Sequence, residues 1–177
     1  MRALALYSLA EFQTGHATTL RVRMDGRSFG VADDGRGHAI ERSIDGLAYL
    51  TFVYTHLDYP FKTSRGAAIQ LHGIGTSLVN VLCSELVVTA RKRHATLHMH
   101  FLNGRLHKQH VVEVDSDRTG NTIAGTIRKP LHFEDAGPES IRQWLRDVSL
   151  ANQSLHLHFN DETLGPAAVD LEHKDRR

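Results

Sequence analysis

The chain has 177 residues, of which 41% are hydrophobic, enough for one buried core but too few for two full domains. Its 21 basic and 20 acidic residues leave a formal net charge of +1, which excludes a global attraction to nucleic acid or membrane. The single cysteine, Cys83, excludes an internal disulfide, and we expect a small buried thiol in a reducing, cytoplasmic setting. No apolar run approaches membrane-spanning length.

The first third of the sequence predicts a helix and a hairpin. Residues 2–13 have the pattern of an amphipathic helix, and its polar residues follow too soon for a secretory signal. Residues 19–24 alternate apolar and polar side chains, and Asp25-Gly26 then turns the chain into a second strand over residues 28–32. This second strand places Asp33 at its end.

The next segment predicts two helices separated by a loop. Residues 40–56 carry apolar side chains mostly at helical spacing, and Tyr59-Pro60 stops that helical region. Residues 61–70 are polar and small and predict a loop, after which Thr76 to Leu82 continue as an apolar helix.

The remainder predicts a meander, a strand, a helix and a last strand. Asn103-Gly104 marks a tight hairpin turn, and Pro138 opens the helix. The expected strands span residues 85–92, 95–102, 105–114, 121–132 and 154–159, and the helix spans 138–148. Because no repeat or linker interrupts residues 1–177, we expect one α+β domain, a mixed β-sheet with helices packed on one face.

Two glycine-bearing motifs indicate a nucleotide site. In Asp33-Asp34-Gly35-Arg36-Gly37, the glycines let a flat ligand approach the backbone and the first carboxylate can accept a hydrogen bond from an amine. In Gln70-Leu71-His72-Gly73-Ile74-Gly75-Thr76-Ser77-Leu78-Val79-Asn80, backbone N–H groups before an apolar helix can face a phosphate. Each motif alone also matches an ordinary turn, but their order and context favour a shared site.

Together the motifs resemble the ATP-binding (GHKL-type) domain of the DNA gyrase B subunit and its topoisomerase IV counterpart. The likeness includes His72 and Asn80 as well as the glycines. It extends through Gly15-His16-Ala17-Thr18, Gly125-Thr126 and residues 145–152, and so covers nearly the whole chain. It implies the ATPase sandwich shared by gyrases, chaperones and histidine kinases.

The resemblance assigns nucleotide-binding roles to residues of both motifs. Asp33 would accept a hydrogen bond from the adenine amino group, Gly37 would let the base stack closely, and Thr126 would assist from a late strand. The lid backbone would wrap the triphosphate, and Lys62 would approach its terminal phosphate. The residues implied to bind ATP are Asp33, Gly35, Gly37, Lys62, Leu71, His72, Gly73, Ile74, Gly75 and Thr126.

The first helix departs from the family pattern. The family carries a glutamate that activates water and, four residues later, an asparagine that holds Mg²⁺, and the register puts Ala3 and Tyr7 at these positions. Ala3 cannot accept a proton, and a phenol is a poor Mg²⁺ ligand. We therefore expect no catalytic residue, impaired hydrolysis and nucleotide binding that does not depend on Mg²⁺. Glu11 is expected to pair with Arg36 and brace the loop after the second strand.

The resemblance also implies what the chain would lack. Without the family's N-terminal arm, transducer and DNA-cleavage domains it would meet DNA only indirectly and would not act alone as a topoisomerase. Two alternatives stay open: a regulatory or scaffold module that has lost nucleotide affinity and contacts a topoisomerase subunit, and an ATPase fragment completed by a partner chain. No membrane partner is expected.

The 13 histidines raise the question of a metal site. His98 with His100, and His156 with His158, each share one face of a predicted strand. No thiol or carboxylate completes an evident site, so a solvent-facing surface is the favoured interpretation and no metal is expected. Ser77 lies within a predicted helix and lacks a nucleophile-elbow sequence, which argues against a Ser-His-Asp hydrolase.

Overall fold

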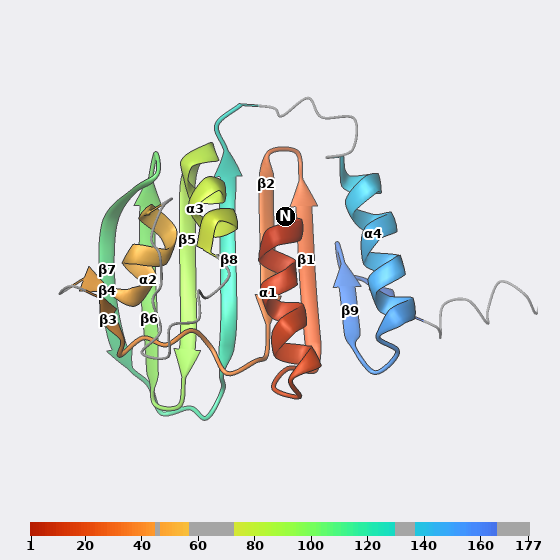
Figure 1. Cartoon of the computed structure of the whole chain (residues 1–177), viewed down its shortest axis with the longest axis horizontal. Coiled ribbons are helices and arrows are strands. Elements are labelled where there is room, and N and C mark those ends of the chain that lie inside the picture. Colours follow the sequence, from red (N-terminus) through yellow and green to blue (C-terminus); the bar gives the residue numbers. More distant parts are fainter. Residues whose placement is uncertain (45–46, 57–72, 130–136, 166–177) are drawn as a thin grey trace, which may run out of the picture.

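The computed structural model describes residues 1–44, 47–56, 73–129 and 137–165. Within these ranges the chain forms one eight-stranded sheet in the order β10-β9-β1-β2-β8-β5-β6-β7, with helices along one face (Figure 1). Strands β1 and β9 pair in parallel, and every other pairing in this sheet is antiparallel. The expected α+β class, a mixed sheet with helices on one face, is confirmed.

The N-terminal elements follow the sequence pattern closely. Helix α1 (Arg2–Gln13) packs over β1 (Thr19–Asp25) and β2 (Ser28–Asp33), which pair as the expected hairpin. Leu4 and Leu9 of α1 are buried against this part of the sheet. The alternating burial along β2 puts Asp33, its last residue, on the helix-covered side.

The long helix expected over residues 40–56 is wrong. That stretch instead contains a short hairpin of β3 (Ser43–Ile44) and β4 (Leu47–Ala48), followed by α2 (Tyr49–Thr55). The sequence between the two short strands is Asp45-Gly46, a strong hairpin-turn signal, and it overrides the helical spacing of the flanking apolar residues. Only the last part of the segment is helical.

The expected meander is confirmed. After α3 (Gly73–Leu82), the chain runs through β5 (Cys83–Lys92), β6 (Ala95–Leu102) and β7 (Arg105–Glu113), with Asn103 and Gly104 in the left-handed region at the second turn. Cys83 is buried as expected, and it is the first residue of β5.

The last elements close both sides of the central hairpin. Strand β8 (Gly120–Ile127) inserts between β2 and β5, which brings its first residues beside the end of β2. Helix α4 (Pro138–Ala151) is followed by β9 (His156–Phe159) and by β10 (Glu162–Leu164), a short edge strand that the sequence pattern did not predict.

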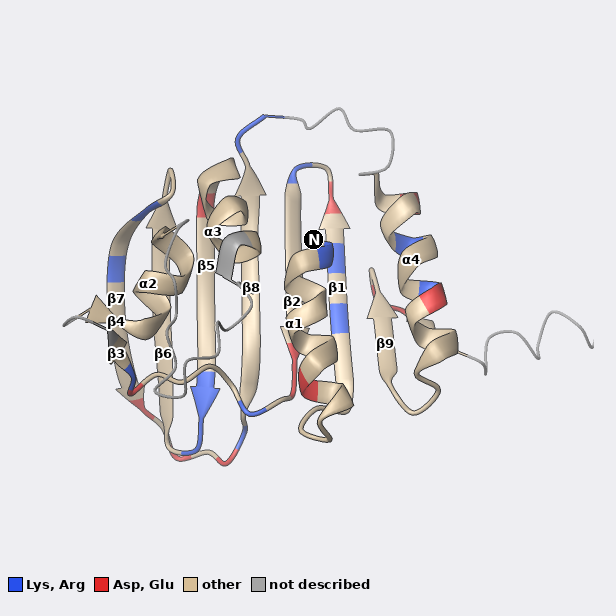
Figure 2. Cartoon of the chain, viewed as in Figure 1, with Lys and Arg blue, Asp and Glu red and all other residues tan. Residues whose placement is uncertain are grey.

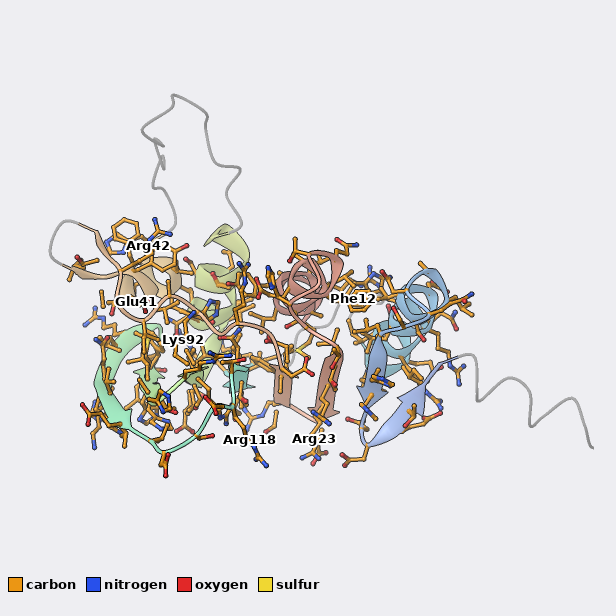
Figure 3. All side chains as sticks on the ribbon, turned by 90° about the horizontal axis from the view of Figure 1, so that it is seen from below. Phe12, Arg23, Glu41, Arg42, Lys92 and Arg118 are labelled. Atoms are coloured by element: carbon orange, nitrogen blue, oxygen red, sulfur yellow. The ribbon has the colours of Figure 1, made fainter. Side chains whose placement is uncertain are left out.

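The hydrophobic core lies between the sheet and the helices, and it includes Leu20, Leu86, Phe101 and Leu157. Figure 3 shows helices on one side of the sheet only, with Arg23 and Arg118 on the side away from them. We call that second side the open face. No helix in the described ranges is long and apolar enough to cross a membrane.

Candidate functional site

Asp33 is a buried carboxylate at the end of β2, with 9% of its surface exposed. The Ser8 hydroxyl donates to Oδ2 at 2.8 Å, and the Gly35 amide donates to Oδ1 at 3.0 Å. Asn121 donates its backbone N–H to Oδ1 at 3.3 Å, and its side-chain Nδ2 lies 3.4 Å from both oxygens. Burial raises the pKa of Asp33, while the bonds from Ser8, Gly35 and Asn121 act in the opposite direction.

A second buried group, His38, adjoins this carboxylate through Asn121. The backbone N–H of His38 donates to Oδ1 of Asn121 at 2.9 Å, and its ring Nδ1 lies 3.1 Å from the Tyr7 hydroxyl. Burial lowers the pKa of His38 to about 4, so its imidazole is neutral at pH 7. Nε2 of His38 and the hydroxyl of Tyr54, two ring systems 6.3 Å apart, have no hydrogen-bond partner among the described atoms.

Close backbone packing explains two glycines around the carboxylate. Gly37 has φ +72°, and a Cβ there would lie 2.1 Å from the carbonyl oxygen of Arg91. Gly120 has φ +126°, and a Cβ there would lie 2.1 Å from the carbonyl oxygen of Asp33. Only glycine allows these approaches, which bring the loop after β2 and the start of β8 against their neighbours.

The brace expected between Glu11 and Arg36 is confirmed. The guanidinium donates from Nη2 to Oε1 at 2.8 Å and from Nε to Oε2 at 3.1 Å, and the Arg36 amide also donates to Oε2 at 3.1 Å. These bonds hold the pKa of Glu11 below its ordinary value. The loop that follows Asp33 is thereby fixed to α1.

Helix α1 also meets the start of α3 directly. A Cβ built on Gly75 would lie 2.7 Å from the Cβ of Ala3. The first turn of α3 therefore packs against α1 at Ala3, the residue that stands at the family's general-base position. One turn further along α1, burial and the nearby carboxylates of Glu11 and Asp33 raise the pKa of Tyr7 to about 12. The Tyr7 phenol therefore stays protonated at neutral pH.

The structure brings together only part of the predicted site. Asp33, Gly35 and Gly37 lie in one loop, and Gly73, Ile74 and Gly75 form the first residues of α3. The predictions for Lys62, Leu71 and His72 lie outside the described residues.

The structure does not bring Thr126 to the carboxylate. It pairs with Ser28 at the opposite end of β2, five residues from Asp33, or about 16 Å along the strand. Asn121, the second residue of β8, lies beside Asp33. Thr126 is suggested only by the resemblance of Gly125-Thr126 to the family motif, and that match does not say which residue of β8 faces the end of β2.

Three further polar residues of the site, Ser8, His38 and Tyr54, carried no sequence signal for such a role. These three residues lie far apart in the sequence, and only the packing of β2, β8 and the covering helices brings them together. Ser77, by contrast, is a structural residue whose hydroxyl lies within hydrogen-bond distance of two backbone carbonyls, those of Val53 and His56, and can donate to either.

Beside the loop lies a hollow of about 640 Å³, lined among others by Arg36, Ile40, Lys92 and Thr119. Figure 3 places Glu41 and Lys92 in this part of the molecule, and Figure 2 shows basic residues at the adjacent end of β5. The hollow shares Arg36 with the loop that follows Asp33, and its lining carries Lys92 and Arg93 as well as the carboxylate of Glu41.

Comparison with known proteins identifies similar chains. The chain is 30% identical over 165 residues to the B subunit of DNA topoisomerase 4 from Mycoplasma pneumoniae, covering 86% of this chain and 26% of that protein. It is 31% identical over 175 residues to the B subunit of DNA gyrase from Thermus thermophilus, covering 92% and 27%. The chain therefore spans about a quarter of the length of these relatives. No protein-family model matches it.

Solved structures show the same fold. The 43K ATPase domain of Thermus thermophilus gyrase B, in complex with an aminocoumarin, superposes with a TM-score of 0.73 at 24% identity, covering 93% of this chain and 44% of that one. The topoisomerase IV ATP binding domain of Francisella tularensis, in complex with a small molecule inhibitor, gives a TM-score of 0.75 at 18% identity, covering 94% and 85%.

Proposed function

We propose that this chain, a GHKL-type ATPase domain of the gyrase B and topoisomerase IV kind, binds an adenine nucleotide beside Asp33 and hydrolyses it slowly or not at all. The observation that carries the proposal is the buried Asp33 carboxylate at the end of β2, in a loop braced by Glu11 and Arg36. Keeping a carboxylate out of water is costly, and such groups are concentrated at functional sites.

An adenine amino group can reach this carboxylate by replacing its weakest partner. Each carboxylate oxygen accepts about two hydrogen bonds, and the contacts from Asn121 Nδ2 are the longest, at 3.4 Å. Turning the Asn121 amide aside frees one acceptor position on Oδ2 for the amine of the base, and it also gives up the bond that Oδ1 of Asn121 accepts from the His38 N–H. The shorter bonds from Ser8 and Gly35 keep the carboxylate oriented while this exchange takes place.

Slow hydrolysis follows from the side chains of α1. Ala3 has no group that accepts a proton, and the Tyr7 phenol is protonated and engaged with His38. Neither side chain supplies the carboxylate or carbonyl oxygen that Mg²⁺ prefers, so the residues here do not fit a magnesium site on α1. Nucleotide binding is accordingly proposed to be independent of Mg²⁺.

A scaffold module without nucleotide affinity is the second candidate, and one observation favours it. Donors from the chain itself already surround both oxygens of Asp33. Such a module would act through a contact with another protein, for which a topoisomerase subunit is the proposed partner, and it would meet DNA only through that partner. A third candidate is an ATPase fragment whose catalytic groups come from a partner chain.

Calorimetric titration with a non-hydrolysable ATP analogue, with and without Mg²⁺, separates the first two candidates. The leading proposal expects binding that disappears in Asp33→Asn and persists in Asp25→Asn, an exposed carboxylate at the far end of the same hairpin. Absence of binding in the unmodified chain favours the scaffold. The third candidate expects phosphate release only when a transducer segment from a gyrase-type subunit is added.

A further inference from the structure

Histidines gather on the open face of the sheet, away from the proposed nucleotide site. The core side chains of β6 are Leu97, Met99 and Phe101, so His98 and His100 between them point to the open face. Asp33 lies on the helix-covered side. Any ligand held by these histidines therefore occupies a different surface of the protein.

The strand register pairs His98 with a histidine from the neighbouring strand. His98 of β6 lies directly opposite His110 of β7, and their ring centroids are 5.1 Å apart. The sequence pattern alone pairs His98 with His100, its neighbour two residues along the same strand. The closer partner comes from across the hairpin, where facing Cβ atoms are about 5 Å apart.

This separation matches two imidazoles on one metal ion. With zinc–nitrogen bonds of about 2.0–2.1 Å and tetrahedral geometry, two coordinated rings have centres about 5 Å apart. The rings now lie 23° from parallel, and they need to turn about χ2 to aim one nitrogen each at a shared point. That torsion is broad for histidine, and His110 is exposed, so the turn is inexpensive.

The surroundings form a shallow site on the open face. The two rings line a hollow of about 330 Å³ together with Val87, His100 and Lys108. Nδ1 of His98 lies 3.4 Å from the Thr89 hydroxyl, which leaves Nε2 of that ring for a ligand. His100 is engaged by Glu85 at 2.8 Å, so it is not counted among the ligands.

We propose that His98 and His110 together bind a transition-metal cation of the Zn²⁺ type, with water completing the coordination shell. In the described ranges no three His, Cys, Asp or Glu side chains are arranged as a ready metal site, so the two imidazoles are the ligands that this part of the chain supplies. Neutral imidazole nitrogens suit Zn²⁺, Ni²⁺ and Cu²⁺ better than Mg²⁺ or Ca²⁺.

The hollow also contains a basic side chain that favours an anion. Anion binding is therefore the outcome against which metal binding is tested. Lys108 lies opposite His100, lines the hollow and carries a positive charge. A phosphate would be held by this ammonium group and by imidazole N–H donors, and not by ring nitrogens acting as ligands.

The test is a calorimetric titration of the full chain with Zn²⁺ at pH 7.5, accompanied by histidine side-chain NMR. We expect one bound ion per chain, and at least tenfold weaker binding in each of His98→Gln and His110→Gln. His158→Gln is the matched control, because His158 also lies on the open face beside a threonine hydroxyl, Thr163 at 3.3 Å, but lacks a facing imidazole. It should change the affinity less than twofold.

Three results overturn the proposal. The first is Zn²⁺ affinity that falls equally in all three variants, and the second is affinity that falls in none of them. The third is a shift of the His98 and His110 signals by inorganic phosphate and not by Zn²⁺, which would identify an anion site. Melting temperatures without metal establish that each variant is folded.

Discussion

Replacing Asp33 tests whether the carboxylate organises the end of β2. Asp33→Ala removes the acceptor for the Ser8 hydroxyl, the Gly35 amide, and the backbone and side-chain N–H groups of Asn121. A buried donor left without a partner costs about 1–3 kcal/mol, and water entering the vacated space recovers part of that cost. We expect a loss of about 3 kcal/mol in the free energy of unfolding.

Asp33→Asn should cost much less, about 1 kcal/mol or below. The asparagine oxygen can accept from Gly35 and from the Asn121 backbone, and the Ser8 hydroxyl can rotate to accept from the new amide. Burial raises the pKa of Asp33, so its contribution to stability is fully present below the ordinary pKa of an aspartate and is lost as the pH rises through the folded value. The carboxyl group therefore contributes less to stability at neutral pH than at low pH, and a neutral amide does not have this pH dependence.

Urea unfolding of the two variants at pH 7 gives the comparison, with Asp25→Asn as the exposed control. If Asp33→Ala unfolds within about 1 kcal/mol of the unmodified chain, the donors are satisfied without the carboxylate and the reasoning fails. If Asp33→Asn is as damaging as Asp33→Ala, the negative charge and not the acceptor geometry holds the network.

Three other perturbations follow from the same region. Gly37→Ala should lower the free energy of unfolding in urea by about 2 kcal/mol more than Gly26→Ala does. Both glycines have positive φ, but only a Cβ at position 37 would meet a backbone carbonyl oxygen, at 2.1 Å. Equal losses in the two variants would contradict this reasoning. Burial lowers the pKa of His38 to about 4. The folded chain therefore has additional stability of about 3 kcal/mol above pH 6.5 and loses it as the pH falls toward 4. His38→Phe should remove that part of the pH dependence, and an unchanged pH profile would argue against burial as its cause. Glu11→Gln should speed amide hydrogen exchange in the loop after β2, because it weakens the bonds from Arg36 that fix this loop to α1. Glu41→Gln, at an exposed residue, should leave the exchange unchanged. Unaltered exchange in Glu11→Gln would mean that the brace does not restrain the loop.

Periodicity predicted the elements whose burial is one-sided. The meander from β5 to β7 and the hairpin of β1 and β2 were each recognised within a few residues of their ends, because their side chains alternate between the two faces of the sheet. The segment over residues 40–56 was misread because spacing was given more weight than the turn signal Asp45-Gly46. The three-residue β10 was missed because so short a strand has almost no periodicity.

The candidate site was predictable where the residues are close in sequence. Asp33 ends β2 and its glycines lie in the loop directly after it, and the brace from Glu11 followed from the family resemblance. Contacts that depend on register could not be obtained in this way. A strand pattern gives the face on which a side chain lies but not its partner on the next strand, so it could not test the resemblance-based choice of Thr126 against Asn121, which lies beside Asp33.

The glycines do not discriminate between a nucleotide site and a scaffold, whereas the replacement of Asp33 by asparagine does. Gly37 and Gly120 are required by backbone contacts at 2.1 Å, with or without a ligand, so a scaffold of this fold needs them equally. Asp33 differs, because removing its charge has separate consequences in the two cases. In a scaffold the carboxylate serves only the donors from Ser8, Gly35 and Asn121, and an asparagine retains most of those bonds. In a nucleotide site the same change also places an amide donor opposite the amine of the base, so a retained fold with lost binding is the result that assigns the carboxylate to a nucleotide.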